Sequence, residues 1–131
     1  MSGVSYGGLE TMLTAETMSH VRGFIVFSGG ARLWANAELQ KRLYSAARNA
    51  KSPIFLIQAA NDYSTAPFDH LGPILRTKEA PNAAKLYPEF GKTHDVAMGH
   101  IAFATWNLGT EVWGEDVLRF ITSALRRDGP H

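Results

Sequence analysis

Pro53-Ile54-Phe55-Leu56-Ile57-Gln58-Ala59 is the stretch of this sequence that decides the fold. After the proline, the run Ile54–Ala59 is nearly continuously apolar and has the length of a buried strand. A second run of this kind, Val21–Ser28, ends at Gly29 and Gly30. Strands that are apolar on both sides must be covered on both faces of their sheet, which is typical of parallel sheets. The two runs therefore predict neighbouring parallel strands.

The segments around these runs have the apolar spacing of helices. Four of them are predicted to be helical: Leu9–Met18, Leu33–Ala50, Pro67–Thr77 and Glu115–Arg127. We expect Pro67–Thr77 to be short or broken because it contains Gly72 and Pro73, and we expect a third strand at Ala84–Phe90. Strands separated by helices predict right-handed βαβ units, and hence an α/β fold with a short, mostly parallel sheet flanked by helices. Sites in such sheets form beyond the carboxyl ends of the strands.

Length and composition predict a single globular domain over residues 1–131, with 45% hydrophobic and 19% charged residues. The net charge is only +1 and the charges are scattered, so nucleic acid is not an expected partner. The apolar runs are too short to cross a bilayer, so no membrane partner is expected either. The chain has no cysteine, which excludes disulfide scaffolds, cysteine-based zinc sites and cysteine nucleophiles. With no signal-peptide pattern at the N-terminus, we expect a cytoplasmic protein.

Gly3-Val4-Ser5-Tyr6-Gly7 matches the pattern G-x-S-x-G, and Gly8 extends it. In this pattern the serine lies on a strained strand-to-helix turn, and the glycines let backbone segments approach without a clashing Cβ. The turn exposes the serine hydroxyl and places the next backbone N–H, that of Tyr6, beside a developing oxyanion. Because glycine and serine are common in any turn, the motif needs a matching acid and base elsewhere in the chain.

Asp62 is the candidate acid because it follows the strand Ile54–Ala59 almost directly. Its carboxylate is therefore expected at the carboxyl-end edge of the sheet. The alternative is an aspartate that only stabilises a turn or caps a helix. Asn61 is a weaker candidate because it carries no charge, and Asp69 because it lies in the next predicted helix.

His100 is the candidate base, in a predicted loop between the third strand and the final helix. Gly99 precedes it and Phe103 follows, which favours it over its rival His94; the alternative is a histidine with no role in the chemistry. The other histidines are poorly placed for the chemistry: His20, His70 and His131. None of the histidines forms a metal motif, so no metal is expected.

These roles describe a serine hydrolase that needs no cofactor. Ser5 attacks an ester carbonyl, His100 moves the proton, and Asp62 holds the imidazole and stabilises its charged form. Three further side chains are candidates for substrate binding: Trp34, Tyr63 and Trp106. Packing is the alternative for Trp34 and Trp106, capping of its loop for Tyr63, and Trp113 is interpreted as packing. Ser28-Gly29-Gly30 is interpreted as a plain turn, with a contribution to the site as the alternative.

At these residues the chain resembles the dienelactone hydrolase / prolyl-oligopeptidase branch of the α/β-hydrolases. The segments that carry the resemblance span most of the chain: GVSYGG (3–8), FIVFSGGARLW (24–34), IFLIQAANDYSTAP (54–67), GHIAFA (99–104) and VWGEDVLRFI (112–121). The resemblance implies a nucleophile at Ser5, an acid at Asp62, a base at His100 and an oxyanion donor at the Tyr6 N–H, in the chain order of this fold. Serine at the turn, where cysteine would mark a true dienelactone hydrolase, implies an esterase-type member.

The chain departs from this family at its N-terminus. The family has an N-terminal half with several strands and a second oxyanion donor, whereas only Met1 and Ser2 precede Gly3 here. We therefore expect a minimal fold that lacks the strand leading into the serine. Loss of one oxyanion donor typically lowers the rate by about 100- to 1,000-fold. The strand Val21–Ser28 is expected to present an unpaired apolar edge, which predicts a homodimer or a higher homo-oligomer.

The sequence thus favours a serine carboxylester hydrolase that acts on small, short-chain esters. A peptidase-like or acyl-transfer activity would use the same three residues, and the fold does not separate these reactions. A different alternative is a non-catalytic hydrolase fragment that serves as an interaction module.

Overall fold

Four parallel strands form one sheet in the order β1-β2-β3-β4. The computed structural model describes residues 1–91 and 94–127, so His131 lies outside the described residues. The strands are β1 (Ser2–Val4), β2 (Phe24–Phe27), β3 (Ile54–Ala59) and β4 (Ala83–Tyr87). Each is followed by a helix, so the predicted α/β fold is confirmed, with a sheet that is parallel throughout its described strands.

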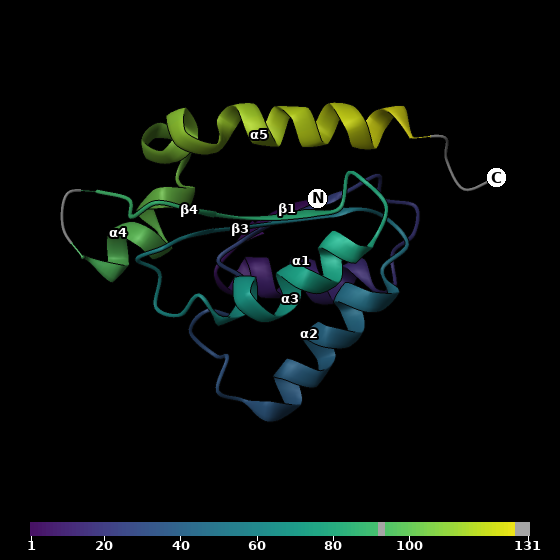
Figure 1. The fold of residues 1–131 in the computed structure, drawn as a ribbon, viewed down its shortest axis with the longest axis horizontal. Coiled ribbons are helices and arrows are strands. Elements are labelled where there is room, and N and C mark those ends of the chain that lie inside the picture. The colour runs from purple at the N-terminus through teal and green to yellow at the C-terminus, as the bar shows by residue number, and fades with distance from the viewer. Residues whose placement is uncertain (92–93, 128–131) are drawn as a thin grey trace.

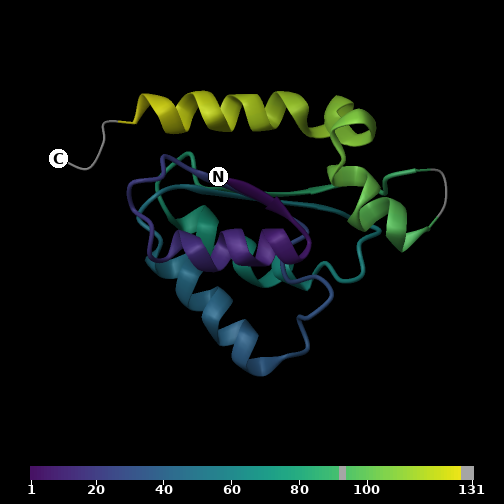
Figure 2. The ribbon, with the colours of Figure 1, turned by 180° about the vertical axis from the view of Figure 1, so that it is seen from behind.

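The helices cover both faces of the sheet. Their bounds are α1 (Tyr6–Ala15), α2 (Ala37–Asn49), α3 (Ala66–Thr77), α4 (Val96–His100) and α5 (Trp106–Arg126), with a 3-10 turn η1 at Ala102–Ala104. α1, α2 and α3 lie on one face and the long α5 runs along the other, while α4 lies beyond one end of the sheet (Figure 1). The view from behind shows the same three layers (Figure 2). No helix in the described part of the chain is both long and apolar enough to span a membrane.

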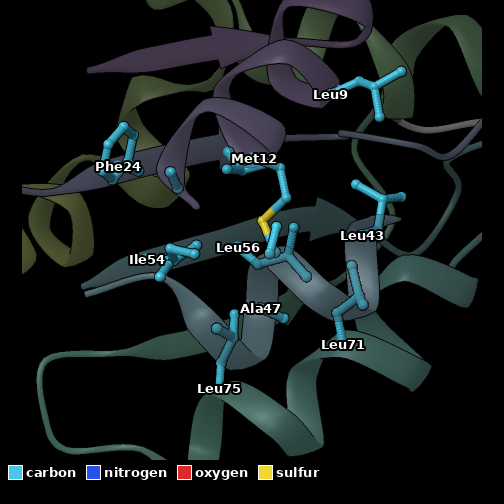
Figure 3. Close-up of a cluster of buried hydrophobic side chains, with 13 residues drawn as sticks. Leu9, Met12, Phe24, Leu43, Ala47, Ile54, Leu56, Leu71 and Leu75 are labelled. Carbon is cyan, nitrogen blue, oxygen red and sulfur yellow. The ribbon is translucent and has the colours of Figure 1, made fainter. Parts of the chain in front are cut away.

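Two apolar cores, one on each side of the sheet, explain the continuous apolar strands. On the side of α1–α3, Phe24 and Val26 of β2 and Ile54 and Leu56 of β3 pack with residues of the three helices (Figure 3). The intervening residues of the same strands point to the other side and pack under α5. Each Å² of apolar surface that is removed from water stabilises the fold by about 25 cal/mol, so burial on both faces favours this three-layer arrangement. The prediction of two covered faces is confirmed.

Several helix boundaries differ from the predictions. α1 begins at Tyr6 rather than Leu9, directly after the turn at Ser5. α2 begins at Ala37 rather than Leu33, because the Asn36 side chain caps it by accepting a hydrogen bond from the Leu39 N–H at 3.0 Å.

The other predicted helices also differ. α3 is one unbroken helix despite Pro73, whose ring faces solvent, so the expectation of a short or broken helix was wrong. The last helix begins at Trp106, nine residues before the predicted Glu115. Gly109 allows this early start, because a Cβ there would lie 1.7 Å from the carbonyl oxygen of Phe103.

The strand that leads into Ser5 is present, which corrects the expectation that it is missing. β1 pairs in parallel with β2, so β2 has a neighbour on each side and does not present the predicted unpaired edge. The free edge on this side belongs to β1. The Met1 carbonyl and the Ser5 N–H form hydrogen bonds with β2. Backbone groups of successive strand residues point to alternate sides, so those of Ser2 and Val4 face the free edge.

Candidate active site

Ser5 lies in a strained turn between β1 and α1. Its backbone angles are φ 57° and ψ −117°, a conformation that costs a non-glycine residue about 1–3 kcal/mol. Two backbone hydrogen bonds hold the turn: the Ser5 N–H donates to Phe27 and the Leu9 N–H donates to the Ser5 carbonyl, both at 2.9 Å. The strain is typical of functional turns, where the surrounding structure holds a side chain in one exposed position.

The glycines around Ser5 differ in what they contribute. A Cβ on Gly3 would lie 2.1 Å from the carbonyl oxygen of Gly7, and one on Gly8 would lie 2.6 Å from that of Phe27. A Cβ on Gly7 would meet nothing within 4 Å. The turn therefore needs glycine at the first position of the motif and at Gly8, where backbone segments come into contact, but not at Gly7.

Ser5, His100 and Asp62 form one continuous chain of hydrogen bonds. Ser5 Oγ lies 2.6 Å from His100 Nε2, and His100 Nδ1 lies 2.6 Å from Asp62 Oδ1. His100 is 2% exposed and the Asp62 side chain is fully buried, whereas Ser5 is partly accessible. A carboxylate only accepts hydrogen bonds, so Nδ1 carries the proton toward Asp62 and Nε2 is free to accept from the Ser5 hydroxyl. This tautomer suits a base that takes a proton from serine.

Three donors surround the Asp62 carboxylate. Besides His100, the Tyr63 N–H donates to Oδ1 at 2.7 Å, and Gln58 Nε2 donates to Oδ2 at 2.9 Å. Burying a charge is unfavourable unless it is compensated, and these three hydrogen bonds compensate the buried carboxylate. The alternative, that Asp62 only stabilises a turn or caps a helix, does not account for its buried contact with His100.

His100 is the last residue of α4 and does not lie in the loop that the sequence predicts. The Ser28 hydroxyl donates to its carbonyl at 3.3 Å, and the Tyr63 ring packs edge-on against the imidazole at 4.9 Å. The Arg32 guanidinium lies over the Tyr63 ring, 4.9 Å from its centroid. Tyr63, from the segment after β3, thus packs against the imidazole, and Ser28, after β2, binds the backbone of the same residue.

The rival residues have other surroundings. Asn61 joins the chain after β4 to the sheet: its Nδ2 donates to the carbonyls of Phe90 at 2.9 Å and Asp95 at 3.0 Å. The Asp69 carboxylate, in α3, accepts a hydrogen bond from the hydroxyl of Thr65, the residue just before that helix. His94 is exposed and lies 2.6 Å from Glu89. The remaining described histidines lie elsewhere: His20 is on the surface and His70 stacks on Trp34.

A pocket of about 290 Å³ opens beside Ser5. Its lining comes from the start of α1 and the segment after β2: Ser5, Tyr6, Leu9, Ser28, Gly30, Arg32 and Leu33. The Ser28-Gly29-Gly30 segment therefore borders the pocket as well as forming a turn. The lining is mainly apolar and includes Ser5.

The three candidate substrate-binding side chains have other surroundings. Tyr63 contacts His100, as described, and Trp34 packs on His70 at 5.5 Å between ring centroids. Trp106 is 71% exposed at the start of α5, with its ring 6.2 Å from that of Trp113. None of the three lines the pocket. Trp113 is buried and its Nε1 donates to the Phe103 carbonyl at 2.6 Å, as a packing residue would.

The backbone N–H of Tyr6 is the first of α1 and so has no partner within the helix. It lies next to Ser5 at the positive end of the helix dipole, where negative charge is stabilised. The described residues contain no cluster of three or more side chains suited to hold a metal ion. Comparison of the chain with protein-family models, curated proteins and solved structures finds no match.

Sequence reasoning named the three central residues together but missed Gln58, and it favoured a plain turn over a contribution to the site for Ser28. A signal for Gln58 was available, because a polar residue inside a buried apolar strand is an informative exception. Gln58 is the single polar residue of β3 and is fully buried. No comparable signal marked the Ser28 hydroxyl, since serine is common where strands end.

Proposed function

We propose that this chain is a serine carboxylester hydrolase that acts on small, short-chain esters. The observation that carries the proposal is the hydrogen-bonded chain from Ser5 through His100 to Asp62, with both of its links at 2.6 Å. An unbroken serine–imidazole–carboxylate arrangement is the constellation of nucleophilic acyl transfer, whatever the fold. Its base and acid are buried while its serine is accessible, as this chemistry requires.

The acylation step follows from these positions. The Ser5 Oγ attacks the ester carbonyl carbon while its proton moves to His100 Nε2, and Asp62 stabilises the imidazolium that forms. The carbonyl oxygen becomes an oxyanion, which the Tyr6 N–H stabilises. When the C–O bond to the leaving alcohol breaks, His100 returns the proton to the alcohol oxygen, and the acyl group stays on Ser5.

Deacylation repeats these steps with water. Water loses a proton to His100 Nε2 and attacks the acyl carbon, and collapse of the intermediate releases the carboxylic acid and returns the proton to Ser5. No cofactor or metal takes part in this proposal.

Pocket size supports small substrates. About 290 Å³ lies at the lower end of ordinary ligand sites. Leu9 and Leu33 make part of its wall apolar, which suits a short acyl chain, and Arg32 is also part of its lining. The proposed partner is therefore a small ester.

Membership in the dienelactone hydrolase / prolyl-oligopeptidase branch is part of the proposal. The strand, serine turn and helix, followed by an acid after β3 and a histidine after β4, occur in the α/β-hydrolase order. We also propose cytoplasmic residence and self-association into a homodimer or higher oligomer. The unpaired strand edge that supports association is that of β1, not that of the strand in Val21–Ser28 as the sequence predicted.

The test is hydrolysis of a short-chain p-nitrophenyl ester by purified protein and by Ser5→Ala. The expected result is hydrolysis that is lost in Ser5→Ala and in His100→Ala, with His94→Ala as the matched control that keeps it. No hydrolysis above buffer, or hydrolysis that Ser5→Ala retains, would contradict the proposal and favour a non-catalytic interaction module. Transfer of the acyl group to an added amine or alcohol in preference to water would indicate the acyl-transfer alternative.

A further inference from the structure

Gln58 is a fully buried amide at the end of β3, four residues before Asp62. Its side chain is on the same side of β3 as Ile54 and Leu56, which belong to the apolar core under α1–α3. A buried amide in such surroundings is unfavourable unless all of its polar atoms are satisfied, so its partners show what holds it there.

Each polar atom of Gln58 has a partner at 2.9 Å. Nε2 donates to Asp62 Oδ2 and to the Ser64 carbonyl, and Oε1 accepts from the Phe68 N–H in the first turn of α3. The two acceptors and the one donor fix the orientation of the amide. A flipped amide would place Oε1 against two acceptors and leave the Phe68 N–H facing an NH₂ group.

This orientation fixes the plane of the Asp62 carboxylate. Oδ1 receives the hydrogen bonds of His100 and Tyr63, and Gln58 binds the other oxygen from within the sheet. With both oxygens held, rotation of the carboxylate away from His100 Nδ1 would break the bond from Gln58. The rigid strand β3 thereby sets the direction in which Asp62 points.

We infer that Gln58 is a positioning residue of the proposed reaction: it acts through Asp62 to hold the His100 imidazole in line with Ser5. The inference rests on the proposed function and extends it to a residue that does not touch the substrate. A shift of about 1 Å in a reacting group can lower a rate by as much as about 100-fold. The structural alternative is that Gln58 only joins β3 to the start of α3.

The test compares Gln58→Met and the milder Gln58→Asn with Asn82→Leu. Asn82 is the matched control because its Oδ1 accepts from the Ile54 N–H at the opposite end of β3, far along the strand from the site. Kinetics are measured on a p-nitrophenyl ester. We expect kcat to fall about 10- to 100-fold in both Gln58 variants with KM unchanged, and kcat to stay within twofold of wild type in Asn82→Leu. A structural role alone would leave kcat unchanged in Gln58→Asn, or lower it equally in Asn82→Leu, and would overturn the inference.

A second readout does not depend on turnover. The proton on His100 Nδ1 lies in a short hydrogen bond to a buried carboxylate, which moves its NMR resonance to low field. We expect this resonance in the wild type and in Asn82→Leu, and a shifted or lost resonance in both Gln58 variants. If the ester is not hydrolysed but the resonance responds in this way, the proposed function fails and the positioning role holds. An unchanged resonance in Gln58→Asn would contradict the positioning role.

A double-mutant cycle completes the test. If Gln58 acts through Asp62, then Gln58→Asn has no further effect on kcat once Asp62 is replaced by Ala. Independent losses that multiply in the double variant would contradict the inference.

Discussion

Gly99 packs against Asn61 so closely that a Cβ on Gly99 would lie 2.5 Å from the Asn61 amide oxygen. Asn61 directly precedes Asp62, and Gly99 directly precedes His100. The contact therefore joins the two segments that carry the acid and the base. Asn61 also holds the chain before α4 through its bonds to the Phe90 and Asp95 carbonyls, so this amide helps to position α4.

Gly99→Ala is expected to separate the acid and the base. The new methyl would force α4 away from Asn61, so we expect a loss of about 1–3 kcal/mol in the free energy of unfolding and a fall in kcat by as much as about 100-fold. Urea unfolding and p-nitrophenyl ester kinetics measure the two effects. Gly114→Ala is the control, because its Cβ would meet a side-chain methyl, that of Thr110 at 3.1 Å, and no backbone atom outside its own helix within 4 Å. Wild-type kcat in Gly99→Ala would show that the contact does not position His100.

The two glycines of the serine motif are expected to respond differently to alanine. Gly3→Ala places a Cβ 2.1 Å from a backbone oxygen, so we expect a loss of at least about 1–3 kcal/mol in unfolding free energy, with loss of activity. Gly7→Ala meets nothing and lies in a helix, where alanine is favoured over glycine by as much as about 1 kcal/mol. Urea unfolding should therefore rank Gly7→Ala at or above wild type and Gly3→Ala well below it. Equal losses in the two variants would contradict this account of the turn.

An acid-sensitive contact joins α5 to β4. Lys85 donates to Asp116 at 2.7 Å, and this bond, with that from the Tyr87 hydroxyl, holds the pKa of the Asp116 carboxyl below its ordinary value. A carboxyl whose pKa is lowered on folding adds stability above its unfolded pKa, and that stability is lost as the pH falls through the folded pKa. The relevant window begins near pH 4 and extends downward, since an unperturbed Asp titrates at about 3.9.

Asp116→Asn is expected to lose this part of the pH dependence. Near pH 6 the variant should be less stable than wild type, and the difference should shrink as the pH falls below about 4. Urea unfolding at pH 6 and pH 3 measures both values. Because the contact lies away from Ser5, kcat should stay near wild type. Stability curves that remain parallel from pH 6 to pH 3 would show that Asp116 gains no such stabilisation on folding.

Self-association is expected to use the edge at β1. Beside this edge, a groove of about 320 Å³ includes Ser2, Ile25, Ile121 and Leu125, and Ile121 and Leu125 of α5 are exposed. Ile121→Glu combined with Leu125→Glu should shift an oligomer toward monomer in sedimentation velocity. Thr122→Glu, on the same helix outside the groove, should not. A sharp monomer peak for wild type at micromolar concentration would contradict the prediction.

Some of the fold could be predicted from the sequence because the signal is local. β3 has the predicted bounds, since one apolar run after Pro53 is buried on both faces. β1 has only three residues and exists through its pairing with β2, so no pattern within the segment marks it. The start of α5 was missed because Gly109 is typical of a loop, yet here glycine lets the helix pack against the Phe103 carbonyl.

Part of the candidate site could likewise be predicted from the sequence, and part could not. Asp62 and His100 could be named in advance because each follows a predicted strand of a parallel sheet, where such side chains converge. Ser5 could be named because it lies in the G-x-S-x-G motif, although the strand before it was not predicted. The bonds that hold them could not be named, because they depend on tertiary packing. Gln58 reaches Asp62 only through the path of the chain after β3, and Ser28 reaches the His100 carbonyl only because β2 and α4 come together.

Reaction of Ser5 with a p-nitrophenyl alkylphosphonate tests the central claim most directly. The Ser5 Oγ would attack phosphorus, p-nitrophenolate would leave, and the phosphonyl group would stay on the serine. The account predicts one phosphonyl group per chain, located on Ser5 by peptide mass spectrometry, with no labelling of Ser5→Ala and much slower labelling of His100→Ala than of His94→Ala. No labelling of the wild type, labelling at another residue, or equal rates in the two histidine variants would contradict it.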